Sequence, residues 1–202
     1  MKVSGGLKCD GFPCSDVRHD CFVVPDVDID PAGVKVIMVS EAAPVWREDY
    51  YYAGKEALFA QTTVQALRDA GVQVSSISDI LDLGVYLTTA VKCGKASYGI
   101  LPATVQECSM ILEKEIALFP LAKVFLLMGD IAIKSLNFIA KRAGEPRVIP
   151  AGATYKIRGQ QYYFRSARAF PSYLQAGPSF FIEKSKRRMI AEDIAVAMKL
   201  VG

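Results

Sequence analysis

Short apolar runs rich in β-branched residues alternate along this chain with segments of helical periodicity. Residues 34–40, 85–91 and 122–128 form three such runs and predict buried strands. The connection at residues 55–71 carries an apolar stripe on one helical face and ends at a glycine, a residue suited to a helix terminus. The pattern therefore predicts a strand, a helix and a second strand in succession.

A second helix is predicted between the second and third apolar runs. Thr104 and Glu107 have the spacing of a capping box, which predicts a helix beginning there. An apolar stripe follows at helical spacing: Val105, Cys108, Leu112, Ile116 and Phe119.

The last third of the chain predicts a helix, a hairpin and a further helix. Residues 129–144 have helical periodicity, residues 154–168 predict a hairpin with Arg158 and Gly159 at its turn, and a final helix is expected from about Ser179 to Leu200. Alternating strands and helices predict a three-layer α/β/α sandwich with a central, mainly parallel four-stranded sheet. Ligands of such sheets bind at the carboxyl ends of the strands.

Composition bounds the class of protein. The chain has 202 residues, of which 51% are hydrophobic and 22% charged, and no low-complexity linker divides it. We therefore expect one globular domain over residues 1–202. No uninterrupted apolar run of about 18 residues occurs and the first nine residues lack the apolar middle of a secretory signal, so we expect a cytoplasmic protein without a membrane partner. The net charge of +3 is too small to indicate a partner by itself.

Five cysteines are the clearest chemical feature. A reducing compartment and the odd number both argue against a disulfide framework. Cys9 and Cys14 lie close together near the amino terminus, Cys93 follows a predicted strand, and Cys108 lies in the next predicted helix. Four thiolates suit either an iron-sulfur cluster or structural zinc, and the alternative is that they are small buried apolar residues.

Five motifs occur in a fixed order: CDGFPC, SEAAP, YLTTAVKC, CGKASYGILPATVQEC and FPSYL. In order and distance they resemble the iron-sulfur uracil-DNA glycosylases often called family four. That family has paired amino-terminal cysteines, a strand ending in Gly-Glu-Ala-Pro-Gly, a Tyr-Ile-Thr-Asn-x-x-Lys-Cys segment, another cysteine on a helix and a late His-Pro-Ser-Tyr-Leu loop. The resemblance spans nearly the whole chain and implies a uracil-DNA glycosylase-like α/β fold that acts on DNA.

The resemblance also implies roles for individual residues. Cys9, Cys14, Cys93 and Cys108 would hold a [4Fe-4S] cluster, with Cys21 spare or an alternative ligand. The gap of four residues in the first cysteine pair is wider than is usual in the family.

Three matches concern the chemistry of base excision. Glu41 matches the family glutamate that orients or activates water. Phe170 replaces the loop histidine that stabilises the transition state, and Thr89 replaces the asparagine that reads the uracil edge. A single hydroxyl does not reproduce the donor and acceptor pair of an amide, so we expect little uracil excision.

The remaining matches concern contacts to the base and to DNA. Tyr52 is the candidate that stacks on the extracted base, although Tyr50, Tyr51 and Tyr52 together suit a cover for the sheet edge equally well. Ser172, Tyr173 and Leu174 resemble the wedge that enters the DNA stack, with packing under the last helix as the alternative. The run containing Lys186, Arg187 and Arg188 suits phosphate contacts or is a solvated face.

These features lead to one functional prediction and two alternatives. We expect a monomeric, DNA-binding uracil-DNA glycosylase-like protein that works in base-excision repair as a hydrolase of a damaged base. The first alternative is a non-catalytic iron-sulfur relative that binds nucleic acid. The second is a structural zinc-binding protein.

Overall fold

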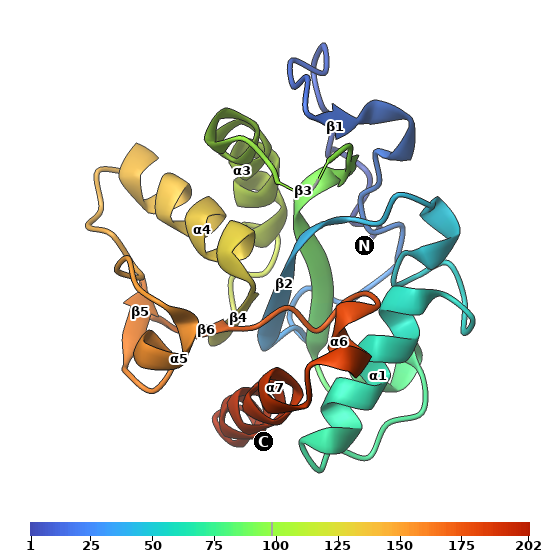
Figure 1. The fold of residues 1–202 in the computed structure, drawn as a ribbon, viewed down its shortest axis with the longest axis vertical. Coiled ribbons are helices and arrows are strands. Elements are labelled where there is room, and N and C mark those ends of the chain that lie inside the picture. Colours follow the sequence, from blue (N-terminus) through green and yellow to red (C-terminus); the bar gives the residue numbers. More distant parts are fainter. Residues whose placement is uncertain (98) are drawn as a thin grey trace.

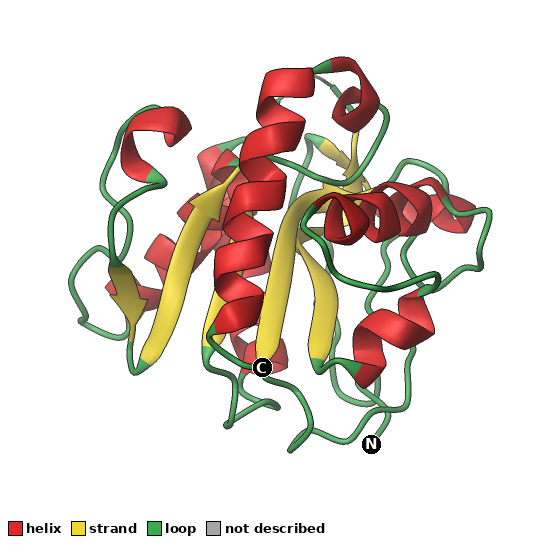
Figure 2. Cartoon of the chain, turned by 90° about the horizontal axis from the view of Figure 1, so that it is seen from below, coloured by secondary structure: helices red, strands yellow, loops and turns green. Residues whose placement is uncertain are grey.

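A six-stranded sheet between two layers of helices forms the centre of the computed structural model, which describes residues 1–97 and 99–202 (Figures 1 and 2). The strands are β1 (Val17–Arg18), β2 (Val36–Ala43), β3 (Val85–Lys95), β4 (Val124–Met128), β5 (Tyr162–Phe164) and β6 (Ala167–Ser172). Their order across the sheet is β1-β3-β2-β4-β6-β5.

The four central strands, β3, β2, β4 and β6, are parallel, and each outer strand pairs antiparallel with its neighbour. The predicted α/β class and mainly parallel sheet are confirmed. The sheet has six strands where four were predicted, and the two outer strands, β1 and β5, are only two and three residues long. The apolar runs predicted as strands became β2, β3 and β4.

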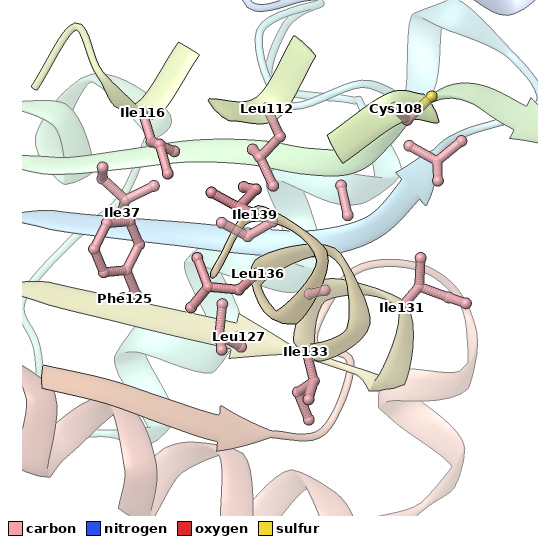
Figure 3. Packing of buried hydrophobic residues seen from close by; sticks show 14 of the residues in the cluster. Ile37, Cys108, Leu112, Ile116, Phe125, Leu127, Ile131, Ile133, Leu136 and Ile139 are labelled. Atoms are coloured by element: carbon pink, nitrogen blue, oxygen red, sulfur yellow. The ribbon is translucent and has the colours of Figure 1, made fainter. Parts of the chain in front are cut away.

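Helices cover both faces of the sheet (Figure 1). They are α1 (Leu58–Asp69), α2 (Ile77–Asp82), α3 (Pro102–Ile116), α4 (Asp130–Arg142), α5 (Thr154–Ile157), α6 (Ser179–Ile182) and α7 (Lys184–Lys199), with 3₁₀ turns η1 (His19–Cys21) and η2 (Arg47–Asp49). Residues of α1, α2, α6 and α7 share one apolar cluster with the sheet, and those of α3 and α4 share the other. Figure 3 shows Leu112 of α3 and Leu136 and Ile139 of α4 packed over Ile37 and Phe125 of the sheet.

The predicted start of the second helix is wrong. Helix α3 begins at Pro102, whose fixed φ and missing N–H suit the first helical turn. Thr104 therefore lies inside the helix, and its hydroxyl donates to Asp16 instead of capping. The local pattern did not reveal this partner, because Asp16 lies 88 residues away along the chain.

Two further boundaries differ from prediction. Residues around Arg158 form α5 and its end, and the hairpin turn lies instead between β5 and β6, where Arg165 has a positive φ of 54°. The predicted last helix is two helices, because Glu183 has φ −99° and ψ 80° and interrupts the helical backbone between α6 and α7. In the part of the chain that the structure describes, no helix combines the length and apolarity needed to cross a membrane.

Candidate active site at the carboxyl ends of the parallel strands

A cavity of about 220 Å³ lies at the carboxyl ends of β2, β4 and β6, the edge at which parallel sheets bind ligands. Five of the site residues predicted from the sequence line this cavity. They are Glu41 from β2, Tyr173 and Leu174 from the segment after β6, and Lys186 and Arg187 from the first turns of α7. The fold thus brings the predicted water-activating group, the predicted wedge and part of the basic run to one place.

Glu41 is held from two sides. Its side chain is 15% exposed, and Oε2 accepts a hydrogen bond of 2.8 Å from Nζ of Lys95 at the end of β3. Oε1 lies 3.5 Å from the backbone nitrogen of Ile131, which donates to it from the first turn of α4. A Cβ at Gly129, where φ is 101°, would lie 2.6 Å from Oε1, so only glycine leaves room for this carboxylate. The role of Lys95 was not predicted, because nothing in the sequence distinguishes it from the other lysines.

The proposed wedge folds against its own protein. Tyr173 and Leu174 are partly buried and pack on the apolar cluster shared with α1 and α7, and Nζ of Lys186 lies 5.5 Å from the centroid of the Tyr173 ring. Ser172 is fully buried, and its hydroxyl donates to Oδ2 of Asp193 on α7 at 2.6 Å. The segment therefore packs against the last helix, as the alternative predicted.

A buried amide fixes the far end of this segment. Gln175 is fully buried, its Oε1 accepts from the hydroxyl of Ser40 at 3.0 Å, and its Nε2 donates to the hydroxyl of Tyr51 at 3.2 Å. These bonds connect the segment after β6 to β2 and to the segment before α1. The network was not predicted, since Gln175 lies 135 residues from Ser40 and 124 residues from Tyr51 along the chain.

Acidic partners pair with the three basic residues predicted to contact DNA, Lys186, Arg187 and Arg188. Lys186 pairs with Glu183 at 2.6 Å, and Arg188 lies 3.6 Å from Glu192. Arg187 donates to both carboxylate oxygens of Asp69 on α1, and these hydrogen bonds hold the pKa of Asp69 below its ordinary value. Arg187 thus joins α7 to α1 in addition to facing the cavity.

Thr89 and Phe170 are not among the residues that line the cavity. Thr89 is fully buried on β3 opposite Ser40, and its hydroxyl has no hydrogen-bond partner among the described residues. Phe170 is buried in β6, with the guanidinium of Arg168 4.5 Å from its ring centroid. Both positions of the family's polar groups therefore lie in the packed interior.

Tyr52 covers the outer edge of β3. Its hydroxyl donates to the carbonyl of Leu87 at 2.9 Å and accepts from the N–H of Leu87 at 3.2 Å, which satisfies both backbone groups of an edge residue. Tyr52 also lines a larger cavity of about 610 Å³ beside α1 and α2. The edge-covering alternative therefore describes its contacts in the structure.

The four predicted cysteine ligands lie in one neighbourhood. Cys93 and Cys108 are buried members of the apolar cluster under α3, and Cys9 and Cys14 pack against that cluster from the amino-terminal segment (Figure 3 shows Cys108). Burial, and to a smaller extent the neighbouring thiols of Cys108, Cys9 and Cys14, raises the pKa of Cys93 to about 12. Burial likewise raises the pKa of Cys108 to about 11.

All five cysteines have free thiols. Within the described ranges, no group of three or more His, Cys, Asp or Glu side chains is close enough to hold a metal ion. The chemistry of the set, four thiols partly or fully withdrawn from water, fits a thiolate-ligated centre. Cys21 is also buried, and its Sγ lies near Gly94 of β3.

The fold places a carboxylate beside a cavity at the carboxyl ends of a mainly parallel sheet, and comparison with known proteins gives the family. The chain belongs to the uracil DNA glycosylase superfamily, whose model matches residues 28–192. It is similar to the Type-5 uracil-DNA glycosylase of Thermus thermophilus, with 28% identity over 126 residues, or 61% of this chain and 54% of the relative. The match thus spans about half the length of that relative. The predicted superfamily is confirmed.

Proposed function

We propose that this protein binds DNA and hydrolyses the N-glycosidic bond of a damaged base that has been turned out of the duplex. The observation that carries the proposal is Glu41, a carboxylate held by Lys95 and by the N–H of Ile131 beside a cavity at the carboxyl ends of the parallel strands. Membership of the uracil DNA glycosylase superfamily supports it. A cavity of about 220 Å³ is smaller than the roughly 300 Å³ at which pockets for drug-sized ligands begin, and it suits a single base.

In this proposal Glu41 orients a water molecule against C1′ of the extruded nucleotide and accepts its proton. The oxygen–carbon bond forms, the bond from C1′ to the base nitrogen breaks, and its electron pair leaves with the base, which takes a proton from solvent. Lys95 keeps the carboxylate in place during these steps. Leu174 fills the space that the base leaves in the stack, as apolar wedges do in other base-extruding proteins.

We further propose that uracil is a poor substrate. A positioned donor facing the developing charge is worth about 2.7 to 4 kcal/mol, or two to three decades of rate, and Phe170 supplies none. Thr89 lacks the amide that would pair with the uracil edge, and its hydroxyl is buried away from the cavity.

Excision assays on duplexes with uracil, hypoxanthine or xanthine test this proposal. We expect release of a deaminated purine by the parent protein, loss of that release in Glu41→Gln and little release of uracil. Robust uracil excision by the parent would refute the substrate proposal. Unchanged release by Glu41→Gln would refute the mechanism.

The second candidate function is that of a non-catalytic, DNA-binding relative. It is favoured by one observation: the position of the family's histidine is taken by Phe170, a buried ring in the core. DNA binding without excision of any of the three bases would select this candidate over the first.

Both candidates require DNA binding, and α7 offers a matched pair of variants to test it. Lys186 and Arg188 lie near the cavity end of α7, whereas Lys199 is exposed at its other end. If the basic run contacts phosphates, alanine at Lys186 and Arg188 will lower the slope of log affinity against log salt by about 2, because each lost phosphate contact releases about one counterion fewer. Lys199→Ala should leave the slope unchanged. Equal slopes for all three proteins would show that the run is a solvated face.

We also propose that Cys9, Cys14, Cys93 and Cys108 hold a [4Fe-4S] cluster. Their shared neighbourhood and thiol chemistry support the proposal. The cluster would connect the amino-terminal segment to β3 and α3, which is a structural role. Four thiolates also suit zinc, which is the alternative to be distinguished by metal analysis.

A further inference from the structure

Trp46 is the single tryptophan of the chain and lies on its surface. It follows β2 directly after Pro44 and Val45, and it is 59% exposed. An isolated exposed apolar residue is ordinary, so exposure alone would carry nothing. The surroundings of this ring are what distinguish it.

A guanidinium lies over the indole. The Cζ of Arg18 is 5.6 Å from the ring centroid. The guanidinium donates two hydrogen bonds to the carboxylate of Asp20, from Nη2 at 2.6 Å and from Nε at 3.3 Å. The backbone oxygen of Trp46 accepts a hydrogen bond from the N–H of Asp49 in the η2 turn. The indole is thus supported on a fixed backbone with a cation over the ring.

The loop that carries this ring lies against the end of β3, next to the lysine that holds Glu41. Arg18 pairs with Gly94 in the register of β1 and β3, and Ala43 pairs with the same glycine in the register of β2 and β3. The next residue, Lys95, bonds Glu41. A Cβ at Gly94 would lie 3.0 Å from the oxygen of Pro44 and 3.1 Å from Cα of Val45, so the absent side chain lets the Trp46 loop lie against β3.

We propose that Trp46 stacks on a nucleobase of the bound DNA next to the one that enters the cavity. The inference rests on the proposed DNA binding, and it adds a second contact at the same edge of the sheet. Aromatic side chains stack on unpaired bases of any sequence, because every base has a π-face. An indole with a guanidinium over its ring suits this use, since the exposed remainder of the ring is available to a base.

The local charge favours a base over a phosphate as the partner. Asp20 pairs with Arg18, Glu41 pairs with Lys95, and the loop after Trp46 carries Glu48 and Asp49. Arg47, the next residue after Trp46, is exposed, donates to the carbonyl of Phe22 and has no acidic partner among the described residues. The other charges beside the ring are paired or acidic, which favours the face of a base over a phosphate as the partner.

Because Trp46 is the single tryptophan, its fluorescence reports directly on this contact. We would titrate the full-length protein with oligothymidylate and with an abasic oligomer of equal length, and follow binding independently by anisotropy of labelled oligomers. Oligothymidylate should quench the emission, and the abasic oligomer should quench it much less. Trp46→Ala should bind oligothymidylate about tenfold more weakly, whereas Trp46→Phe should retain most of the affinity.

Tyr163 provides the matched control. It is 55% exposed and has a guanidinium 5.5 Å from its ring, but it lies on β5 at the opposite edge of the sheet. Tyr163→Ala should bind like the parent. If DNA binds while Trp46 emission and the affinity of Trp46→Ala stay unchanged, this inference is wrong and the proposed DNA binding stands. An equal effect of Trp46→Ala on the abasic oligomer also overturns it, and absence of all binding overturns both.

Discussion

At the scale of single residues, two lysines of β3 form ion pairs that differ in their exposure to solvent. Lys95 and Glu41 are partly exposed at the carboxyl ends of the strands. Lys92 and Glu115 are fully buried under α3, only three residues away along the strand. The first pair is partly accessible to solvent at the candidate site, whereas the second contacts only other groups in the protein interior.

We expect Lys95 to position the carboxylate of Glu41. Loss of a general base typically lowers a rate about 10²- to 10⁴-fold, so Glu41→Gln should fall in that range, with Lys95→Met between it and the parent. Lys95→Arg should recover most of the rate, because it keeps the charge and a donor. Single-turnover excision separates these rates from binding. Equal rates for Lys95→Met and Lys95→Arg would exclude a role for the charge.

The buried pair is expected to contribute strongly when one partner is removed. Glu115 accepts from the hydroxyls of Tyr86 and Thr88 at 2.6 and 2.7 Å and pairs with Lys92, so each removal leaves a charge without its counterpart. Lys92→Met should lower the free energy of unfolding by about 3 to 5 kcal/mol in urea denaturation. The double variant Lys92→Met, Glu115→Gln should regain most of it, since both charges are then absent and the amide oxygen still accepts from Tyr86 and Thr88. A double variant as unstable as the single one contradicts this account.

At the scale of elements, sequence signals succeeded where a local partner fixes the end of an element. Helix α1 ends just before Gly71, whose φ is 85°, as the pattern predicts. The start of α3 was misplaced because Thr104 bonds Asp16, which is 88 residues away. A local sequence pattern shows periodicity, but it does not show which distant carboxylate accepts a hydrogen bond from a given hydroxyl.

The cap of helix α2 is expected to make the stability of the protein depend on pH. Asp79 forms a capping box with Ser76, and hydrogen bonds from Ser75 and Ser76 lower its pKa to about 2. Because the folded pKa lies below the ordinary value of 3.8, the stabilisation is complete above about pH 4 and is lost as the pH falls through about 2. Urea denaturation should therefore find Asp79→Ala less stable than the parent at pH 7, with the difference shrinking toward pH 2. A difference independent of pH would show that the carboxylate charge is not involved.

At the scale of the whole molecule, the amino-terminal segment and the sheet are joined near the cysteines. Cys9 and Cys14 pack against the cluster that contains Cys93 and Cys108. The segment is also attached by the pairing of β1 with β3, by the bond from Thr104 to Asp16 and by burial of Val3, Leu7 and Val17 in the same cluster. A metal centre would therefore stabilise the attachment of this segment to the domain.

If the proposed cluster is present, protein purified without oxygen should be brown and contain about four iron atoms per chain. Cys93→Ser should lose the colour and iron and unfold at lower denaturant, because a metal that binds the folded state contributes to its stability. Cys21→Ser is the matched control and should keep the iron if Cys21 is spare. A colourless, iron-free and folded anaerobic preparation would exclude the cluster, and bound zinc would select the structural alternative.

The sequence by itself determined the class and the superfamily, because both are recorded in local order. Apolar runs predicted three of the four central parallel strands, β2, β3 and β4, and the ordered motifs predicted the superfamily that comparison confirms. Glu41 could be selected in advance, since it lies in a motif at the end of a predicted strand. The neighbourhood of the cysteines followed from the same motif order.

Only the tertiary structure decided what surrounds these residues. It placed Lys95 on Glu41, turned Tyr52 to the edge of β3 and buried Phe170 in the core. It also brought Arg18 over Trp46 beside Gly94. These contacts join parts of the chain that are tens of residues apart, and the backbone path that brings them together depends on the packing of the whole sheet. Periodicity and motifs are local properties, so no short stretch of the sequence contains that information.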